Sequence, residues 1–119
     1  MPNYHLFPAE YNLMKIIWGS EPINSTELSR ECEDKLGWKK STTYTMIRKL
    51  VKKGLIKNEK AIVSALVNEI DVQKDESEQV IRDSFDNSLP TFIRTFLDGK
   101  KITEKDAIEI KKIIEEATK

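Results

Sequence analysis

The chain has 119 residues but a single cysteine, Cys32, and a single histidine, His5. One cysteine excludes an internal disulfide and a thiolate-rich metal site within one chain, and it is typical of a reducing compartment. His5 has no cysteine or paired acid near it in the sequence, so we expect no metal there. No Ser-His-Asp or Cys-His arrangement, phosphate-cradling loop or dinucleotide fingerprint is present. The sequence therefore predicts a protein that is not an enzyme and that holds no metal or cofactor.

Long apolar runs are also lacking. None approaches the roughly 18 residues that a membrane-spanning helix needs, and residues 1–5 lack the basic start and apolar middle of a signal peptide. We therefore expect a cytoplasmic protein without membrane insertion. The 39% of hydrophobic residues can supply a core for one ordinary domain or two small units, which argues against global disorder.

The charges balance to a net charge of zero but are not evenly spread. Between Lys35 and Lys60 the chain has nine lysine or arginine residues and one acid, a local charge of +8. From Lys74 to the end it has nine bases and eleven acids, a local charge of −2. Positive charge gathered in one segment is typical of a surface that contacts nucleic acid, although solvated helix faces also carry such clusters.

The basic segment contains a predicted helix between Trp38 and Gly54, with one apolar and one polar side. Successive residues are about 100° apart on a helix, so positions can be sorted by their angle from Ile47. The side of Ile47 contains Thr43, Tyr44, Leu50 and Val51. The opposite side contains Ser41, Thr42, Thr45, Lys49 and Lys52. We expect the first side to be buried and the second to face outward, with Ser41 as the N-cap.

Small hydroxyl groups at the start of a helix, with lysines behind them, suit a helix that enters the major groove of DNA by its N-terminal end. We expect the hydroxyls to meet base edges and the cations to bind phosphates. The predicted DNA-binding residues are Lys39, Lys40, Ser41, Thr42, Thr45, Arg48, Lys49, Lys52 and Lys53. The alternative is that Ser41 only caps the helix and that the others form ordinary solvated surface.

Two further helices are predicted before this one. Residues 8–18 open with proline at a first helical position and continue with apolar residues at helical spacing. After a break at residues 19–22, Asn24 resembles the start of a capping box, and this helix continues to Leu36 before Gly37. Two short helices joined by a tight turn with glycine form a helix-turn-helix. The side chains expected in or near the core include Trp18, Cys32 and Trp38.

The segments 55–57 and 61–67 have the composition of two strands, joined by residues 58–60. A β-hairpin that follows a helix-turn-helix makes a winged helix. The predicted fold is therefore mainly α with a small β-hairpin: a winged helix-turn-helix DNA-binding domain over residues 1–70, followed by a helical region over residues 71–119.

Three short helices are predicted in residues 71–119: one over 71–87, one from about Ser88 to Gly99, and one that Thr103 caps. So few residues do not give a secure core of their own, whereas two copies together would bury the apolar stripes. We therefore predict a homodimer, which suits the pseudo-palindromic sites of helix-turn-helix proteins. The predicted dimerisation residues are Phe85, Leu89, Phe92, Ile93, Phe96, Leu97, Ile110 and Ile114.

Two spaced motifs carry a resemblance to a known family: Glu-x-x-x-Met-x-x-x-Trp from Glu10 to Trp18, and Lys-Lys-Gly at residues 52–54. With Trp38, and with Leu66-Val67 before an acidic helix, they resemble the penicillinase-repressor (methicillin-resistance repressor) family over nearly the whole chain. The resemblance implies a winged-helix repressor that binds operator DNA as a homodimer through its C-terminal helices. In some members a membrane-bound sensor protease, or a protease it activates, relieves repression by cutting within those helices.

The resemblance also marks individual positions. Residues 40–42 and Thr45 match the part of the family's recognition helix that meets DNA. Lys49 replaces a usual arginine, which keeps the charge and loses bidentate geometry, and the wing is shorter than the family pattern and lacks its glycine and arginine. The family's cleaved Asn-Phe bond aligns with Thr95-Phe96, the candidate proteolytic site. No C-terminal cysteine cluster, the mark of the copper-responsive branch, is present.

Two functions from different classes remain open on these grounds. The leading one is a transcriptional repressor that binds an inverted-repeat operator as a homodimer. The alternative is a winged-helix adaptor whose basic face docks on an acidic protein without sequence-specific DNA binding. Retention of a dimer on duplex DNA would favour the first, and a monomer that ignores DNA would favour the second.

Overall fold

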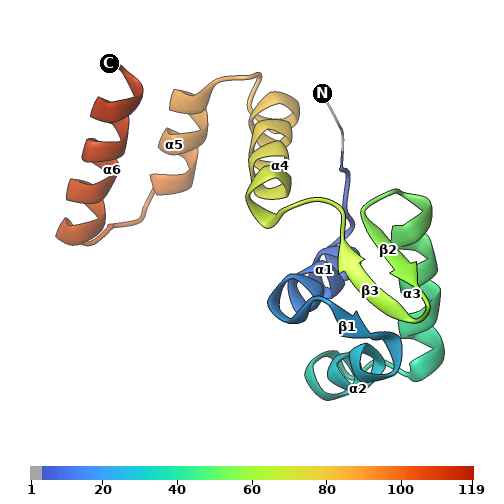
Figure 1. Ribbon diagram of the computed structural model, residues 1–119. Helices are drawn as coiled ribbons and strands as arrows, with labels where there is room; N and C mark the ends of the chain where they lie inside the picture. The colour runs from blue at the N-terminus through green and yellow to red at the C-terminus, as the bar shows by residue number, and fades with distance from the viewer. Residues whose placement is uncertain (1–3) are drawn as a thin grey trace. The chain divides into compact units, whose positions relative to one another are not determined.

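The structure is a computed structural model that describes residues 4–119. It is mainly helical with a small antiparallel sheet, which confirms the predicted fold class (Figure 1). The chain divides into two compact units between Glu78 and Gln79. None of the helices in the described part combines the length and apolarity that crossing a bilayer requires. The elements are α1 (Pro8–Ser20), β1 (Ile23–Asn24), α2 (Ser25–Leu36), α3 (Lys40–Lys52), β2 (Ile56–Glu59), β3 (Ile62–Ala65), α4 (Glu69–Ser84), α5 (Leu89–Leu97) and α6 (Glu104–Ala117).

Helix boundaries follow local capping chemistry. The Asn24 side-chain oxygen accepts a hydrogen bond from the Thr26 N–H at 2.8 Å and thereby starts α2. Gly37 ends the same helix with φ at 69°, a left-handed conformation that glycine adopts at little cost. Thr103 caps α6 by accepting from the Asp106 N–H at 3.0 Å. The caps predicted at Asn24 and Thr103 are thus confirmed.

The sheet has three strands in the order β1-β3-β2, all antiparallel. The register pairs Ile23 with Val63 on one edge and Ile56 with Ala65 on the other. The prediction of two strands was incomplete, because β1 pairs with the hairpin as a third strand. This strand contains only two residues, which is too short to show an alternating pattern.

The hairpin turn consists of Lys60 and Ala61, with φ at 51° and 66°. Positive φ at both central residues defines a type I′ turn, whose twist matches that of the flanking strands. The predicted connection over residues 58–60 was wrong, since Asn58 and Glu59 belong to β2. The usual signal for such a turn, Asn-Gly, is absent here, and the turn places two residues with a Cβ in a conformation that favours glycine.

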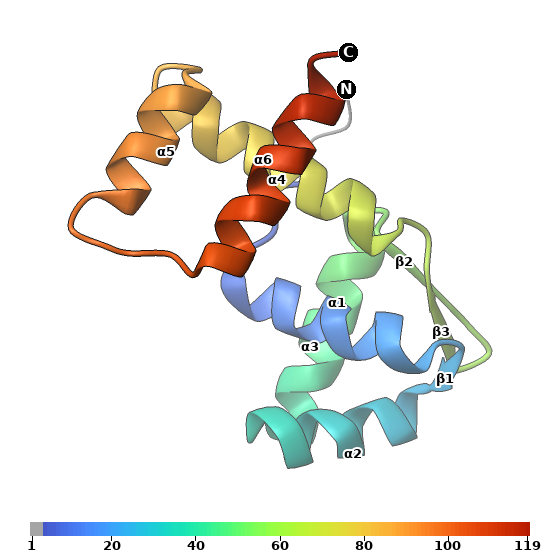
Figure 2. The ribbon, with the colours of Figure 1, turned by 90° about the vertical axis from the view of Figure 1, so that its left-hand side faces the viewer.

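The core of the first unit lies among α1, α2, α3 and the sheet (Figure 2). Trp18 and Trp38 are partly buried and pack against this core, as predicted. The Trp18 indole N–H also donates to the Val67 carbonyl at 3.0 Å, which joins α1 to the chain just after β3. The buried apolar residues of the cluster are Leu13, Met14, Ile17, Ile23, Leu28, Cys32, Ile47, Leu50, Leu55, Ile56 and Val63.

The second unit contains the last turns of α4 together with α5 and α6. No residue of α5 or α6 is buried. The Phe85 and Phe92 rings meet edge to face with centroids 5.2 Å apart, and Phe92 stacks on Phe96 at 6.1 Å. The first contact joins the end of α4 to α5 and the second lies within α5, and many large apolar side chains of this unit stay exposed.

Candidate nucleic-acid interface

The orientation of α3 is fixed by its buried side. Thr43 and Leu50 are fully buried and Ile47 is 2% exposed. The opposite side is in solvent, and we call it the outward face of α3. Its members are Ser41, Thr42, Thr45, Arg48, Lys49 and Lys52, all exposed.

One residue of the predicted buried side is in fact exposed. Val51 is 42% exposed and Tyr44 is half-buried. On the helical wheel both lie on one flank of Ile47, about 40–60° away, whereas the fully buried Thr43 and Leu50 lie on the other flank. The centre of the buried side is therefore rotated toward Thr43 and Leu50, and Val51 falls at its margin.

The start of α3 differs from the prediction. Lys39 is the N-cap and Lys40 the first helical residue, so Ser41 is not the cap and lies in the first turn. Lys39 makes no side-chain capping hydrogen bond. The Ser41 hydroxyl and the first-turn N–H groups are thus not used for capping, and the positive end of the helix dipole lies beside the two lysines. Such an end is well suited to a phosphate.

Contacts within α3 hold part of the outward face in place. Arg48 donates from Nη2 to the Thr45 hydroxyl at 3.2 Å. The Lys40 ammonium lies 5.9 Å from the centre of the Tyr44 ring. These contacts place a guanidinium next to a hydroxyl on one turn of the helix, and they leave both groups exposed to a ligand.

Lys53 has different surroundings from the other predicted cations. Its ammonium lies 2.7 Å from Glu10 Oε1, whose side chain is only 3% exposed. It also donates to the His5 carbonyl at 3.2 Å and lies 5.1 Å from the centre of the Phe7 ring. The structure therefore ties Lys53 to the start of α1, away from the outward face. No local sequence pattern indicates this pair, because its members are 43 residues apart.

Glu10 is held in its charged form by its partners. Burial disfavours the carboxylate, but the hydrogen bonds from Lys53 and the Phe7 N–H and the charges of Lys53 and Lys49 outweigh it. Together they hold the pKa of Glu10 below its usual value. The Phe7 N–H donates to Glu10 at 2.9 Å, so the same carboxylate also closes the first turn of α1.

The junction between α2 and α3 is held by Tyr44. Hydrogen bonds with Ser25 and Thr26 in the first turn of α2 lower the pKa of the Tyr44 hydroxyl. Cys32 is fully buried, and this burial raises the pKa of its thiol. A buried thiol with a raised pKa is a poor nucleophile, so Cys32 acts as a small core residue.

The wing adds two exposed cations that were not among the predicted contacts, Lys57 and Lys60. Lys57 lies 3.9 Å from Glu59, an exposed pair that contributes little to stability. The charge pattern alone signalled these lysines, since both belong to the basic segment. Among residues 4–119, no group of three or more His, Cys, Asp or Glu side chains is placed to hold a metal ion.

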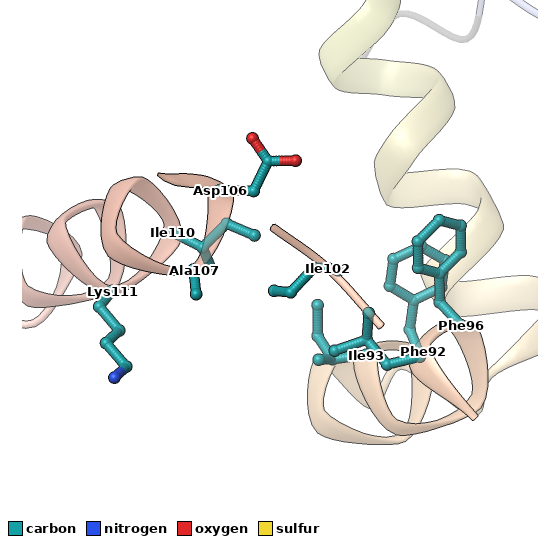
Figure 3. Close-up of a pocket in the computed structure, with 9 residues that line it drawn as sticks. Phe92, Ile93, Phe96, Ile102, Asp106, Ala107, Ile110 and Lys111 are labelled. Atoms are coloured by element: carbon teal, nitrogen blue, oxygen red, sulfur yellow. The ribbon is translucent and has the colours of Figure 1, made fainter. Parts of the chain in front are cut away.

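A second candidate surface lies in the second unit. The predicted dimerisation residues Phe85, Phe92 and Leu97 are half-buried, and Leu89, Ile93, Phe96, Ile110 and Ile114 are exposed. Five of them, Phe92, Ile93, Phe96, Leu97 and Ile110, line an apolar hollow of about 480 Å³ between α5 and α6 (Figure 3). Figure 3 shows Phe92, Ile93 and Phe96 on one wall and Ala107 and Ile110 on the other.

The aligned cleavage pair, Thr95 and Phe96, lies in the last turn of α5. Both residues are exposed, and the Thr95 carbonyl accepts from the Asp98 N–H at 3.3 Å. The Phe96 ring stacks on Phe92 and has the Lys100 ammonium 4.4 Å from its centre. The bond is therefore accessible but helical.

These features define the class of protein: a winged helix-turn-helix fold with a cationic, hydroxyl-bearing outward face on its third helix, followed by a helical unit. The chain belongs to the penicillinase repressor family, which it matches over residues 6–116. The penicillinase repressor of Bacillus licheniformis is 26% identical over 112 residues, which cover 91% of this chain and 88% of that protein. The methicillin resistance regulatory protein MecI of Mammaliicoccus sciuri is 24% identical, with 93% and 94% covered. The Staphylococcus aureus penicillinase repressor is 23% identical, with 93% and 91% covered.

Proposed function

We propose that this chain is a transcriptional repressor that binds an inverted-repeat DNA operator as a homodimer. The observation that carries the proposal is the division of α3 into a side centred on the buried Thr43, Ile47 and Leu50 and an exposed side with hydroxyls first and cations after. A helix held in this way can lie in the major groove with its N-terminal turns toward the bases. Membership of a repressor family supports the same conclusion.

The side chains of the outward face divide into two roles. Thr42 and Thr45 carry short hydroxyls that can donate to or accept from base edges. Lys39, Lys40, Arg48, Lys49 and Lys52 are the proposed phosphate contacts, which position the protein without reading sequence. We leave Lys53 out of this set, because it pairs with Glu10.

The salt dependence of binding tests the phosphate contacts. Three to five cations per copy give about 6–10 neutralised phosphates in a dimer, so log K should fall against log salt with a slope of roughly −5 to −9. Fluorescence anisotropy with a labelled duplex between 50 and 300 mM salt measures this slope. Binding that does not depend on salt would overturn the proposal, and a basic face that binds only acidic proteins would then be favoured.

Substitutions on the outward face separate the two roles. Lys49→Ala removes one contact from each copy of the dimer, so it should weaken binding to all duplexes about equally and reduce the salt slope by about 2. Thr42→Ala and Thr45→Ala should instead relax discrimination at one or two base pairs, by about 0.5–1.5 kcal/mol each. Anisotropy with a series of single-base-pair variants of a bound duplex distinguishes these outcomes. Uniform weakening by all three substitutions would contradict base reading by the threonines.

The proposed dimer rests on the apolar surface of the second unit. Nine of its large apolar residues are between 40% and 61% exposed: Val80, Leu89, Ile93, Phe96, Ile102, Ile108, Ile110, Ile113 and Ile114. Covering the exposed half of such a side chain contributes roughly 1 kcal/mol, or on the order of 10 kcal/mol per chain before the cost of association. Monomers rarely leave a large contiguous apolar patch in water.

An aspartate in this surface tests the dimer. Ile110→Asp should shift the chain from dimer to monomer in sedimentation equilibrium, because it places a charge in the proposed contact. Asn12→Asp, on an exposed position of α1, is the matched control and should leave the dimer intact. A wild-type chain that sediments as a monomer at 100 µM would refute the proposed assembly.

We further propose that any protease acting at Thr95–Phe96 cuts after local opening of α5. A protease binds its substrate as an extended strand, whereas this bond lies within a helix. Limited proteolysis should therefore be slow at this bond in the wild type. It should accelerate in Arg94→Gly, which weakens the helix by about 1 kcal/mol. Equal cleavage rates in the two proteins would contradict the need for opening.

A further inference from the structure

The first unit contains a hollow that shares Lys49 and Lys52 with the proposed phosphate contacts and whose other lining residues have no role in the proposed function. It has a volume of about 710 Å³ and lies between the start of α1 and the C-terminal half of α3. Its apolar lining comes from Phe7, Ala9 and Met46, and its cationic lining from Lys49, Lys52 and Lys53. This volume falls within the range of roughly 300–1,000 Å³ that is typical of small-molecule sites.

The charges around the hollow are unbalanced. The carboxylate in its lining, Glu10, is already paired with Lys53 at 2.7 Å. Lys49 and Lys52 form no ion pair with any residue of the described chain. One carboxylate thus faces three ammonium groups, and a ligand that enters meets an excess of positive charge. The N-terminal end of α1 adds a further positive potential.

The apolar part of the lining is also exposed. Phe7, at the N-cap of α1, is 60% exposed, although large aromatic side chains are usually well covered. Met46 is half-buried, and its flexible thioether can adapt to ligands of different shape. An aromatic ring and a thioether on one side and two unpaired ammonium groups on the other match a molecule with an apolar body and a negative end.

We propose that this hollow binds a small organic carboxylate with an apolar body. The carboxylate lies between Lys49 and Lys52, and the body rests on Phe7, Ala9 and Met46. Lys53 stays paired with Glu10 and shapes the wall. The hollow is formed entirely within the first unit, so binding needs neither DNA nor a second copy.

Binding in the hollow has a consequence that rests on the proposed function. Lys49 and Lys52 are also two of the proposed phosphate contacts. A carboxylate held between them neutralises positive charge on the outward face of α3 and competes with phosphate. The ligand therefore weakens DNA binding, as an inducer of a repressor would.

The experiment uses 4-phenylbutyrate as the probe. 4-Phenylbutylamine has the same apolar part and the opposite charge. Inorganic phosphate is an anion without an apolar part. Methionine methyl groups labelled with ¹³C report the site, since Met46 lines the hollow and the fully buried Met14 does not. We expect the Met46 signal to shift and saturate with 4-phenylbutyrate, and the amine to bind at least about tenfold more weakly, because two exposed ion pairs are together worth about 1.4 kcal/mol.

Two variants with the same charge change give the matched test. Ala9→Glu places a carboxylate in the lining at the second position of α1, where a helix tolerates acids well. It should abolish the Met46 shift. Asn12→Glu, on an exposed position of the same helix outside the lining, should leave the shift unchanged.

Each outcome decides the proposal. Equal binding of the amine, an equal shift with phosphate alone, no Met46 shift, or a shift that survives Ala9→Glu would each overturn it. Because these titrations contain no DNA, they can succeed even if the chain binds no duplex. In a separate anisotropy titration, saturating 4-phenylbutyrate should weaken duplex binding of the wild type but not of Ala9→Glu. DNA binding without this response would overturn only the proposed competition.

Discussion

The Glu10–Lys53 pair offers the sharpest test of how the first unit is held together. We consider Glu10→Gln, which keeps the shape of the side chain and removes its charge. In the wild type, Glu10 Oε1 accepts from Lys53 Nζ at 2.7 Å and from the Phe7 N–H at 2.9 Å. Both hydrogen bonds lie at a carboxylate that is almost fully buried. The bond from Lys53 joins the first turn of α1 to the end of α3, and the bond from Phe7 closes that first turn.

The expected magnitude follows from these two bonds. Hydrogen bonds to a charged group contribute about 1.5–3 kcal/mol each and are roughly twice as strong as neutral ones. A glutamine can still accept both, so about half of their contribution is lost. The lower cost of burying an amide offsets part of this loss. We therefore expect Glu10→Gln to lower the free energy of unfolding by about 1–2 kcal/mol, or Tm by roughly 5–15 °C.

The pH dependence provides an independent check. Since the pKa of Glu10 is lowered in the folded chain, its contribution is fully present above the unfolded value of 4.5 and is lost as the pH falls through the folded pKa. The stability gap between wild type and Glu10→Gln should thus be wide at pH 7 and shrink below pH 4.5. Urea unfolding at fixed chain concentration measures the gap.

The control for this prediction is Glu33→Gln, a change of the same charge at an exposed position of α2. It should alter stability by less than about 0.5 kcal/mol at any pH. A gap for Glu10→Gln that is the same at pH 7 and pH 3.5, or no larger than that of Glu33→Gln, would refute the account of this pair.

Three further predictions follow from particular contacts. Replacing Lys60 and Ala61 by Asn-Gly should raise the free energy of unfolding in urea by about 1 kcal/mol, because these residues suit a type I′ turn; a loss of stability would contradict the turn. Trp18→Phe should lower stability by about 1–2 kcal/mol through loss of the indole hydrogen bond to Val67, and an unchanged Tm would contradict that contact. Lys53→Met should lower stability and leave the salt slope of DNA binding unchanged, whereas a slope reduced by about 2, one contact from each copy, would return this lysine to the phosphate contacts.

Local chemistry allowed much of the fold to be predicted. The caps at Asn24 and Thr103, the proline at the first position of α1 and the glycine at the end of α2 all act within a few residues of their own helix. The outward side of α3 was also predictable, since its period separates hydroxyls and cations from the buried residues. Features of this kind depend only on neighbours in the sequence.

What the sequence did not predict depends on distant partners. β1 exists because Ile23 pairs with Val63, forty residues away, and not because of any pattern in its two residues. The turn at residues 60–61 is set by the register of its strands and not by glycine. Likewise, Lys53 pairs with Glu10 on another helix. This partner is distant in the sequence, and the charge of Lys53 by itself therefore led to the prediction of a phosphate contact.

The most direct test of the central claim is the selection of bound duplexes from a random pool, carried out with the wild type and with Thr42→Ala. We predict that the wild type enriches two inverted half-sites whose centres are one duplex turn apart, about 10–10.5 base pairs, or a multiple of it. Thr42→Ala should enrich the same spacing with a relaxed preference at one or two positions in each half-site. A pool without enrichment, or one with a single unpaired half-site, would contradict a dimer that reads DNA through the outward face of α3.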